Sequence, residues 1–209
     1  GGGYAPHGGF RDDAGPRAPE SAPDALALAR AACLCNDAEL RPADGGWRVE
    51  GDPMEGALLT LAMKAGLDPE AERRAAARVD EIPFDSRRRF MATSHRPVDG
   101  AAAFALIKGA PERVLAMCAA ETRGGETAPI DVASWRARAA ALADDGHRML
   151  AAARAPAPGG GALTTDDVAR GATLLGLVGF IDPPRDEAVA AVADCRRAGV
   201  CVVMITGAH

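Results

Sequence analysis

The 209-residue sequence predicts a mixed α and β protein in two parts. Helical periodicity alternates with strand-like segments through residues 1–172, which we expect to form one α+β domain. From residue 173 the order is strand, helix, strand, and both strands are almost continuously apolar. That pattern is typical of a βαβ unit of a parallel sheet, so we expect a partial α/β domain over residues 173–209.

Charge and cysteine usage limit the classes of partner. The formal net charge is −5 at pH 7, so we expect no nucleic acid partner, which would require a basic surface. The five cysteines follow no disulfide-framework spacing, which indicates a reducing compartment. Cys33 and Cys35 could hold a metal, but no second pair accompanies them, and buried thiols fit better. Because the chain starts without methionine and no apolar run approaches ~18 residues, we expect a soluble piece of a larger protein.

Helix signals dominate the first part of the chain. Ser21-Ala-Pro-Asp is a helix-start signature, Asp52 and Pro53 suit an N-cap and a first helical position, and Gly66 is a natural stop. The elements expected here are an extended lead-in or loose hairpin over 1–20, a helix over 21–37, a short strand over 47–49, and helices over 53–65 and 69–78.

The period then becomes strand-like. A charged connector with an aromatic residue at each end, Phe84 to Phe90, separates the first two strands, and Pro111 and Asp131 suit the starts of two helices. The elements expected here are strands over 79–82, 91–94 and 102–108, helices over 111–118 and 132–143, a strand over 148–154, and a linker over 155–162.

The end of the chain carries the second predicted domain. Thr173 to Ile181 is an apolar strand, Asp182-Pro-Pro-Arg interrupts it, a helix is expected over 186–198, and a second apolar strand over 200–205. The chain stops at His209, so we expect this sheet to be unfinished.

Four segments each place a polar group at the end of a regular element, beside glycine or proline. They are Glu55, the connector from Phe84 to Arg89, Lys108-Gly109, and Arg148. Together they supply an aromatic ring, several cations and a carboxylate, which are the groups that a purine nucleoside triphosphate requires. The sequence contains no Walker-type phosphate loop, HExxH or serine elbow.

Each of these residues also has a purely structural explanation. Glu55 could complete a capping box with Asp52, Phe84 could be a core aromatic, and the connector arginines could form a solvated turn. Lys108 could extend its amine from a buried strand end to solvent. Arg148 could pair with Asp144 or Asp145 at the surface. Composition and spacing alone leave this choice open.

The motifs taken together resemble the cytoplasmic nucleotide-binding (N) domain of P-type cation-transporting ATPases, followed by the start of the phosphorylation (P) domain. GDPMEGALL (51–59) is similar to the family's GDPTEGALL, EIPFDSRRRFM (81–91) to IPFDSxRKxM, and LIKGAPERVL (106–115) to its KGAPE element. DDGHRMLAAA (144–153) is similar to GxRVLAxA, and residues 176–209 follow its DPPR helix and MITGDH pattern. The five motifs occur in the family's order, and the resemblance extends over roughly residues 4–209.

The resemblance implies a fold and a set of roles. The expected fold is an antiparallel sheet flanked by helices, followed by a partial Rossmann-like βαβ unit of the haloacid dehalogenase type. It implies six ATP-binding residues. Phe84 would stack on adenine, Glu55 would bond the adenine edge, and Lys108 would line the pocket floor. Gly109 would let the base approach the backbone, Arg89 stands at the place of the FDSxRK lysine, and Arg148 would reach the phosphates.

The resemblance also implies roles near the C-terminus. Asp182 and Arg185 would lie on the hinge side of the P domain, and Thr206 and Gly207 in its phosphate-facing loop. Ala208 stands where the family pattern has aspartate. The family's DKTGTLT, whose aspartate accepts the phosphoryl group, does not occur in the sequence. We therefore expect this chain to bind ATP but not to hydrolyse it alone.

The implied parent is a pump that couples ATP hydrolysis to cation transport, of the calcium type. Its expected partners are ATP, with Mg²⁺ in the intact protein, and the rest of the pump: the actuator, the remaining P domain and the transmembrane helices. This chain would then be a cytoplasmic domain of an integral protein of a bacterial plasma membrane. Two alternatives are a non-catalytic nucleotide-binding module from a degenerate pump, supported by Ala208, and a fragment of a haloacid dehalogenase-type phosphohydrolase.

Overall fold

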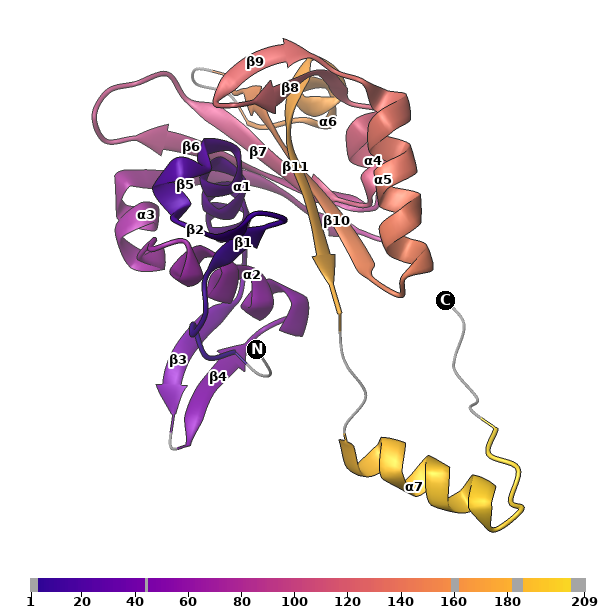
Figure 1. Cartoon of the computed structure of the whole chain (residues 1–209). Coiled ribbons are helices and arrows are strands. Elements are labelled where there is room, and N and C mark those ends of the chain that lie inside the picture. The colour runs from indigo at the N-terminus through magenta and orange to yellow at the C-terminus, as the bar shows by residue number, and fades with distance from the viewer. Residues whose placement is uncertain (1–3, 44, 159–161, 182–185, 204–209) are drawn as a thin grey trace.

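A large mixed sheet forms the centre of the molecule (Figure 1). The computed structural model describes residues 4–43, 45–158, 162–181 and 186–203. In these residues a seven-stranded sheet has the order β5-β6-β7-β10-β11-β8-β9. Neighbouring strands are antiparallel except β11 and β8, which are parallel. The strands are β5 Ala76–Asp85, β6 Phe90–Pro97, β7 Phe104–Gly109, β8 Cys118–Arg123, β9 Glu126–Pro129, β10 Arg148–Pro156 and β11 Ala172–Phe180.

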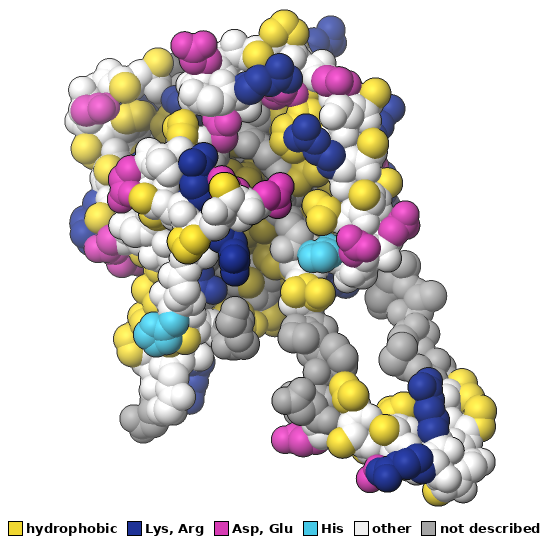
Figure 2. Space-filling view, viewed as in Figure 1, with side chains coloured by type: hydrophobic (Ala, Val, Ile, Leu, Met, Phe, Trp, Pro, Cys, Tyr) yellow, Lys and Arg dark blue, Asp and Glu magenta, His cyan; other side chains and the backbone are white. Residues whose placement is uncertain are grey.

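Helices lie on both faces of this sheet (Figure 1). α1 contacts β7, β10 and β11 on one face, and α2 and α3 pack against α1; α4 and α5 contact β10 on the other. The helices are α1 Pro23–Leu34, α2 Pro53–Lys64, α3 Pro69–Ala75, α4 Pro111–Leu115, α5 Val132–Asp144, α6 Thr165–Val168, α7 Asp186–Arg197 and the 3₁₀ helix η1 Pro19–Ser21. Two hairpins complete the described part, β1 Phe10–Asp12 with β2 Gly15–Arg17 and β3 Glu39–Ala43 with β4 Gly46–Glu50. On the face of the molecule seen in Figure 2, basic and acidic side chains are interspersed.

Alternation along the central strands divides the core into two layers. Phe90 and Ile107 face α4 and pack with Leu115 in one buried cluster. Met91 and Leu106, one position along, face the opposite side and pack against α1 in a second cluster. Side chains of successive strand residues point to opposite faces, so both layers follow from the same two strands.

Three helices begin at the aspartates that supply their N-caps. Asp52 Oδ1 accepts from the N–H of Met54 at 2.8 Å, as the sequence predicts for α2. Asp68 caps α3 and Asp131 caps α5 in the same manner. Pro53 at the first helical position needs no hydrogen-bond partner for its nitrogen, which strengthens the start of α2.

Several boundaries differ from the sequence-based expectation, and two of them change the composition of the sheet. The helix expected over 69–78 ends at Ala75, because Ala76 already pairs with Pro97 in the sheet. The helix expected over 111–118 ends at Leu115, and a β8–β9 hairpin follows it. In that hairpin Gly124 and Gly125 have φ of 64° and 86°, the left-handed pair that a tight two-residue turn requires.

The strand expected at Thr173 to Ile181 is confirmed, but its partners are not those of a βαβ unit. β11 is antiparallel to β10 inside the large sheet. It is almost continuously apolar because both of its faces pack against other elements: Leu174 belongs to the cluster on the α4 side and Leu175 packs against the cluster on the α1 side. Burial on two faces produces the same pattern as a parallel strand.

The remainder of the expected second domain is only partly described. α7 confirms the expected helix, whereas residues 200–203 have no strand assignment, and the rest of the strand expected over 200–205 lies outside the described residues. The haloacid dehalogenase-type unit is therefore not seen in the described part of the chain. The domain boundary at residue 172 stays a prediction.

Candidate functional site

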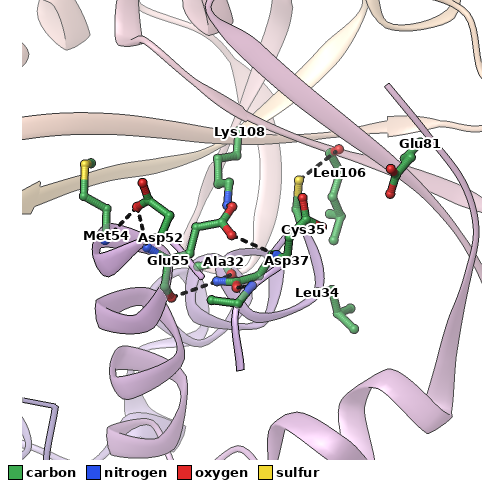
Figure 3. A network of polar contacts seen from close by, with 12 residues as sticks. Ala32, Leu34, Cys35, Asp37, Asp52, Met54, Glu55, Glu81, Leu106 and Lys108 are labelled. Carbon is green, nitrogen blue, oxygen red and sulfur yellow. Dashed lines mark hydrogen bonds and ion pairs between the residues drawn. The ribbon is translucent and has the colours of Figure 1, made fainter. Parts of the chain in front are cut away.

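Lys108 and Glu55 form a buried ion pair where the sheet meets α2 (Figure 3). Lys108 is the penultimate residue of β7, on the same face as Leu106. Its Nζ lies 2.5 Å from Oε1 of Glu55, and the two side chains are only 8% and 15% exposed. The ammonium therefore does not extend to solvent, so this structural explanation of Lys108 is wrong.

The Glu55 side chain points away from the start of its own helix. Asp52 accepts from the N–H groups of Met54 and Glu55. The Glu55 carboxylate bonds Lys108 and, through Oε2, the N–H of Asp37 at 2.9 Å. A capping box would instead return this carboxylate to the Asp52 N–H. Glu55 thus belongs to the site rather than to the cap.

The segment after α1 also contributes to the site, although the sequence did not identify it. The Asn36 Nδ2 donates to the backbone oxygen of Glu55 at 2.9 Å, and Asp37 donates its N–H to the Glu55 side chain. Asn36 is buried. A buried asparagine after an apolar helix was the available signal, because a buried amide almost always has hydrogen-bond partners.

The two cysteines of this segment are separate buried thiols. Cys33 packs with Leu59 on the α2 side, whereas Cys35 packs with Leu106 on the sheet side. Burial raises the pKa of the Cys33 thiol to about 11. Burial also raises the pKa of Cys35, against the opposing effect of the Lys108 charge. In the described residues no cluster of three or more His, Cys, Asp or Glu side chains could hold a metal ion.

Phe84 is exposed rather than part of the core. Its exposed fraction is 63%. Ile82 pairs with Ala92 and Asp85 with Phe90, so β5 has one residue more than β6 between these pairs. The irregularity is a β-bulge, which re-aims side chains at the edge of a sheet. The Phe84 side chain is thus largely exposed at the end of β5.

The connector after Phe84 is a tight turn closed by Asp85. Its carboxylate accepts from the N–H groups of Arg87 and Arg88 at 2.9 and 3.1 Å. These bonds, that of Arg88 first, hold the pKa of Asp85 below its usual value. Arg89 then adopts a left-handed φ of 57°. Such a backbone costs about 1 kcal/mol in a non-glycine residue and persists because the surrounding bonds impose it.

Gly109 brings this turn against the end of β7. A Cβ at position 109 would lie 2.4 Å from the backbone oxygen of Arg89 and 2.7 Å from Cα of Phe90. The observed close approach is therefore between two strands of the protein itself. The Arg89 side chain extends to Glu112 at the start of α4, with 2.5 Å between Nη1 and Oε1, and both side chains are about half exposed.

Arg148 lies at the first position of β10. Its Nη1 is 3.5 Å from the sulfur of Met54, the residue before Glu55. No ion pair between Arg148 and Asp144 or Asp145 occurs in the described part of the chain. Arg148 is thus placed beside the N-terminal turn of α2.

All six predicted nucleotide-binding residues lie at one end of the sheet. The antiparallel order of β5, β6, β7 and β10 places the end of one strand beside the start of the next. Lys108 and Glu55 are in direct contact, Gly109 contacts the Arg89 backbone, and Arg148 is next to Met54. The predicted P-domain residues Asp182, Arg185, Thr206 and Gly207 lie outside the described residues.

Comparisons with known proteins show the family of the chain. A family model described as the cytoplasmic domain N of P-type ATPases matches residues 24–187. Over its whole length the chain is 38% identical to the cation-transporting ATPase pma1 of Synechocystis. It is 40% identical, over 99% of its length, to the probable cation-transporting ATPase F of Mycobacterium tuberculosis.

A third relative is the calcium-transporting ATPase of Bacillus subtilis, which is 35% identical over 84% of the chain. The chain spans 24%, 23% and 20% of the length of these three relatives, so it corresponds to about a quarter or less of each. The family model covers most of the chain, including β11 and the start of α7. The chain belongs to the family of cytoplasmic N domains of P-type ATPases.

Proposed function

We propose that this chain binds ATP and presents its γ-phosphate to an aspartate outside these 209 residues, within a cation-transporting pump. The observation that carries the proposal is the buried Lys108–Glu55 pair, which lies at the same end of the sheet as the exposed Phe84 ring. A free aromatic face beside a fixed carboxylate and a cation is suited to a purine base with attached phosphates.

The proposed roles follow from where each group lies. Phe84 stacks on the adenine, and Glu55 accepts a hydrogen bond from the exocyclic amine with a remaining lone pair of its carboxylate. Lys108 underlies the base and neutralises Glu55. Arg148, exposed beside α2, and Arg89, exposed at the connector, are the cations that meet the phosphates.

Gly109 contributes in an indirect manner. Because it lets the Arg89 backbone approach β7, it determines where the connector ends. Asp182, Arg185, Thr206 and Gly207 keep their proposed place at the hinge and phosphate-facing loop of the P domain.

The parent protein is proposed to be a membrane pump. The relatives bear the names of cation-transporting and calcium-transporting ATPases, which supports cation transport, and calcium as the ion. The actuator, the rest of the P domain and the transmembrane helices would supply the remaining functions, and Mg²⁺ would accompany ATP at the phosphoryl transfer step. In the described residues, the helices lack the length and apolar character that a bilayer span requires.

Calorimetric titration of the chain with ATP, ADP and GTP tests the proposal. We expect weak binding that prefers adenine nucleotides and depends little on Mg²⁺, because the contacts are mostly to the base. Phe84→Ala should weaken ATP binding about tenfold, since stacking of a base on an aromatic ring is worth ~1–3 kcal/mol. Phe10→Ala, in the β1–β2 hairpin, is the matched control. Equal affinity of Phe84→Ala and wild type would show that the ring does not stack on the base.

Hydrolysis provides a second test. The sequence lacks the DKTGTLT nucleophile motif, so we expect no ATP turnover by this chain alone. Release of phosphate above the level of a Phe84→Ala control would contradict this and would favour a phosphohydrolase instead.

A further inference from the structure

The segment between α1 and β3 holds a deeply buried polar side chain beside Glu55. Asn36 is 2% exposed, and both polar atoms of its amide are hydrogen-bonded. The Nδ2 donates to the backbone oxygens of Ala32 at 3.1 Å and Glu55 at 2.9 Å, and the Oδ1 accepts from the N–H of Ala38 at 2.9 Å. Asn36 therefore ties the end of α1 to the first turn of α2.

Besides the bond from its N–H to the Asp52 cap, Glu55 is held at three further points. Asn36 bonds its backbone oxygen, the Asp37 N–H bonds its Oε2 at 2.9 Å, and the Lys108 ammonium bonds its Oε1. Two of the three partners are successive residues of one segment. If that segment moved, both the helix turn that carries Glu55 and one oxygen of its carboxylate would move with it.

Arg78 of β5 fixes this segment from the other side. Its Nη2 donates to the backbone oxygens of Leu34 at 3.3 Å and Asn36 at 2.8 Å, and its Nη1 lies 2.6 Å from Oδ1 of Asp37. The segment is thus held between an arginine on the edge strand of the sheet and a glutamate on α2. Arg78, Asn36 and Asp37 are not among the residues that the sequence motifs assign to nucleotide binding.

We infer that Asn36 is a positioning residue for Glu55: it fixes the carboxylate in the orientation that recognises the exocyclic amine of adenine. The inference rests on the proposed function of Glu55 and extends it to base selectivity. Asn36 itself touches no part of the nucleotide in this scheme. Its effect passes through the first turn of α2 and through the Asp37 N–H.

A positioning role and a merely structural role predict different binding data. If Asn36 only stabilised the fold, its loss would weaken the binding of all nucleotides equally. If it aims Glu55, its loss would remove selectively the part of the affinity that comes from the amine. Purine riboside triphosphate, which lacks the exocyclic amine of ATP but keeps the ring and phosphates, isolates that part.

The experiment measures the dissociation constants of both nucleotides for the 209-residue chain by calorimetry. We expect wild type to bind ATP about tenfold more tightly than purine riboside triphosphate, the value of one hydrogen bond to a charged acceptor. In Asn36→Ala this ratio should fall to within about twofold of unity, while the affinity for the analogue changes little.

Thr60→Val is the matched control. Thr60 is also buried and lies on α2, but its hydroxyl bonds the backbone oxygens of Gly56 and Tyr4 and does not touch Glu55. It should keep the wild-type ratio. If Asn36→Ala does not fold, Arg78→Met tests the inference instead, because Arg78 is partly exposed. Loss of its bonds to the segment should lower the ratio of the two dissociation constants about threefold.

The outcomes separate this inference from the function on which it rests. A wild-type chain that binds neither nucleotide overturns the proposed function and the inference with it. A wild-type chain that binds both equally overturns the role of Glu55 as the reader of the amine, and hence the inference. If wild type discriminates and both Asn36→Ala and Arg78→Met keep its ratio, the proposed function stands and the positioning role is wrong.

Discussion

At the scale of single residues, Lys108 has a structural role in addition to the nucleotide-binding role proposed for it. Its ammonium is buried against Glu55, so removing one partner leaves the other charge without compensation. Buried pairs differ in this respect from the exposed pair of Arg89 and Glu112, whose attraction is largely screened by water.

Lys108→Met should therefore lower the free energy of unfolding by about 2–4 kcal/mol, because it leaves the buried Glu55 carboxylate without its ion-pair partner. The double variant Lys108→Met with Glu55→Gln should lose less than the single variant, since the unpaired charge is then gone. Urea denaturation measures both. Arg89→Asn, which tolerates the left-handed backbone and breaks only the exposed pair, should cost less than about 1 kcal/mol. If the loss of unfolding free energy in the double variant equalled the sum of the losses in Lys108→Met and Glu55→Gln, the two side chains would not be coupled.

At the scale of elements, the decisive contact is between β7 and the turn that precedes β6. Gly109 pairs with Phe90, and the Ala110 N–H donates to the Arg89 oxygen at 2.9 Å just beyond it. The atoms that a Cβ at 109 would meet are backbone atoms, which cannot rotate away as the end of a side chain could.

We expect Gly109→Ala to destabilise the chain by about 1–3 kcal/mol, the usual range for overpacking. It should also weaken ATP binding, because the connector that carries Phe84 and Arg89 must shift. Thermal unfolding followed by circular dichroism and titration with ATP check the two effects. Gly9→Ala, where a Cβ would meet nothing within 4 Å, should change neither. Wild-type stability of Gly109→Ala would show that the strands can separate at no cost.

A second link between elements depends on a buried carboxylate. Glu121 of β8 accepts from Trp135 Nε1 at 2.5 Å and from the N–H of Asp131, and so fastens the start of α5 to the sheet. Burial raises the pKa of Glu121, but the bonds from Trp135, Arg123 and Asp131 outweigh it and the pKa is lowered. The sequence did not predict this link, because of β8 only Cys118 fell within an expected element, the end of a helix, and the hairpin was not expected.

At the scale of the whole molecule, buried titratable groups determine how stability depends on pH. Burial lowers the pKa of His95 from 6.5, and the Arg78 charge adds to the effect. The unfolded chain then binds a proton that the folded chain does not, so stability decreases as the pH falls below about 6.5. Carboxylates with lowered pKa values, Glu121 and Asp85 among them, stabilise the fold above their unfolded pKa and lose this effect as the pH falls below about 4.5.

We therefore expect the free energy of unfolding to decrease in two steps between pH 7.5 and pH 3. His95→Gln should flatten the first step, near pH 6.5, and leave the second unchanged. Urea denaturation at intervals of half a pH unit distinguishes them. A variant that keeps the slope of wild type between pH 7 and pH 5 would show that another group causes it.

The amino-acid sequence alone determines the short-range features of the fold, such as helix starts, strand periodicity and turns. Asp52, Asp68 and Asp131 begin their helices through bonds that span only a few residues. Strand-like periodicity predicts the central strands. The Gly124-Gly125 pair is also typical of a hairpin turn, although the expected elements did not include this hairpin. The motifs also identified the family, because the chain keeps their residues in order.

What only the tertiary structure decided is which distant segments meet. An apolar pattern states that β11 is buried on both faces, but not that β10 and β8 are its neighbours. Likewise the spacing of Asp52 and Glu55 allows a capping box, and only the approach of Lys108 and Asp37 turns the carboxylate toward the sheet. The physical reason is that periodicity and capping are short-range, whereas strand pairing and buried ion pairs join residues far apart in the chain, whose proximity the local pattern does not encode.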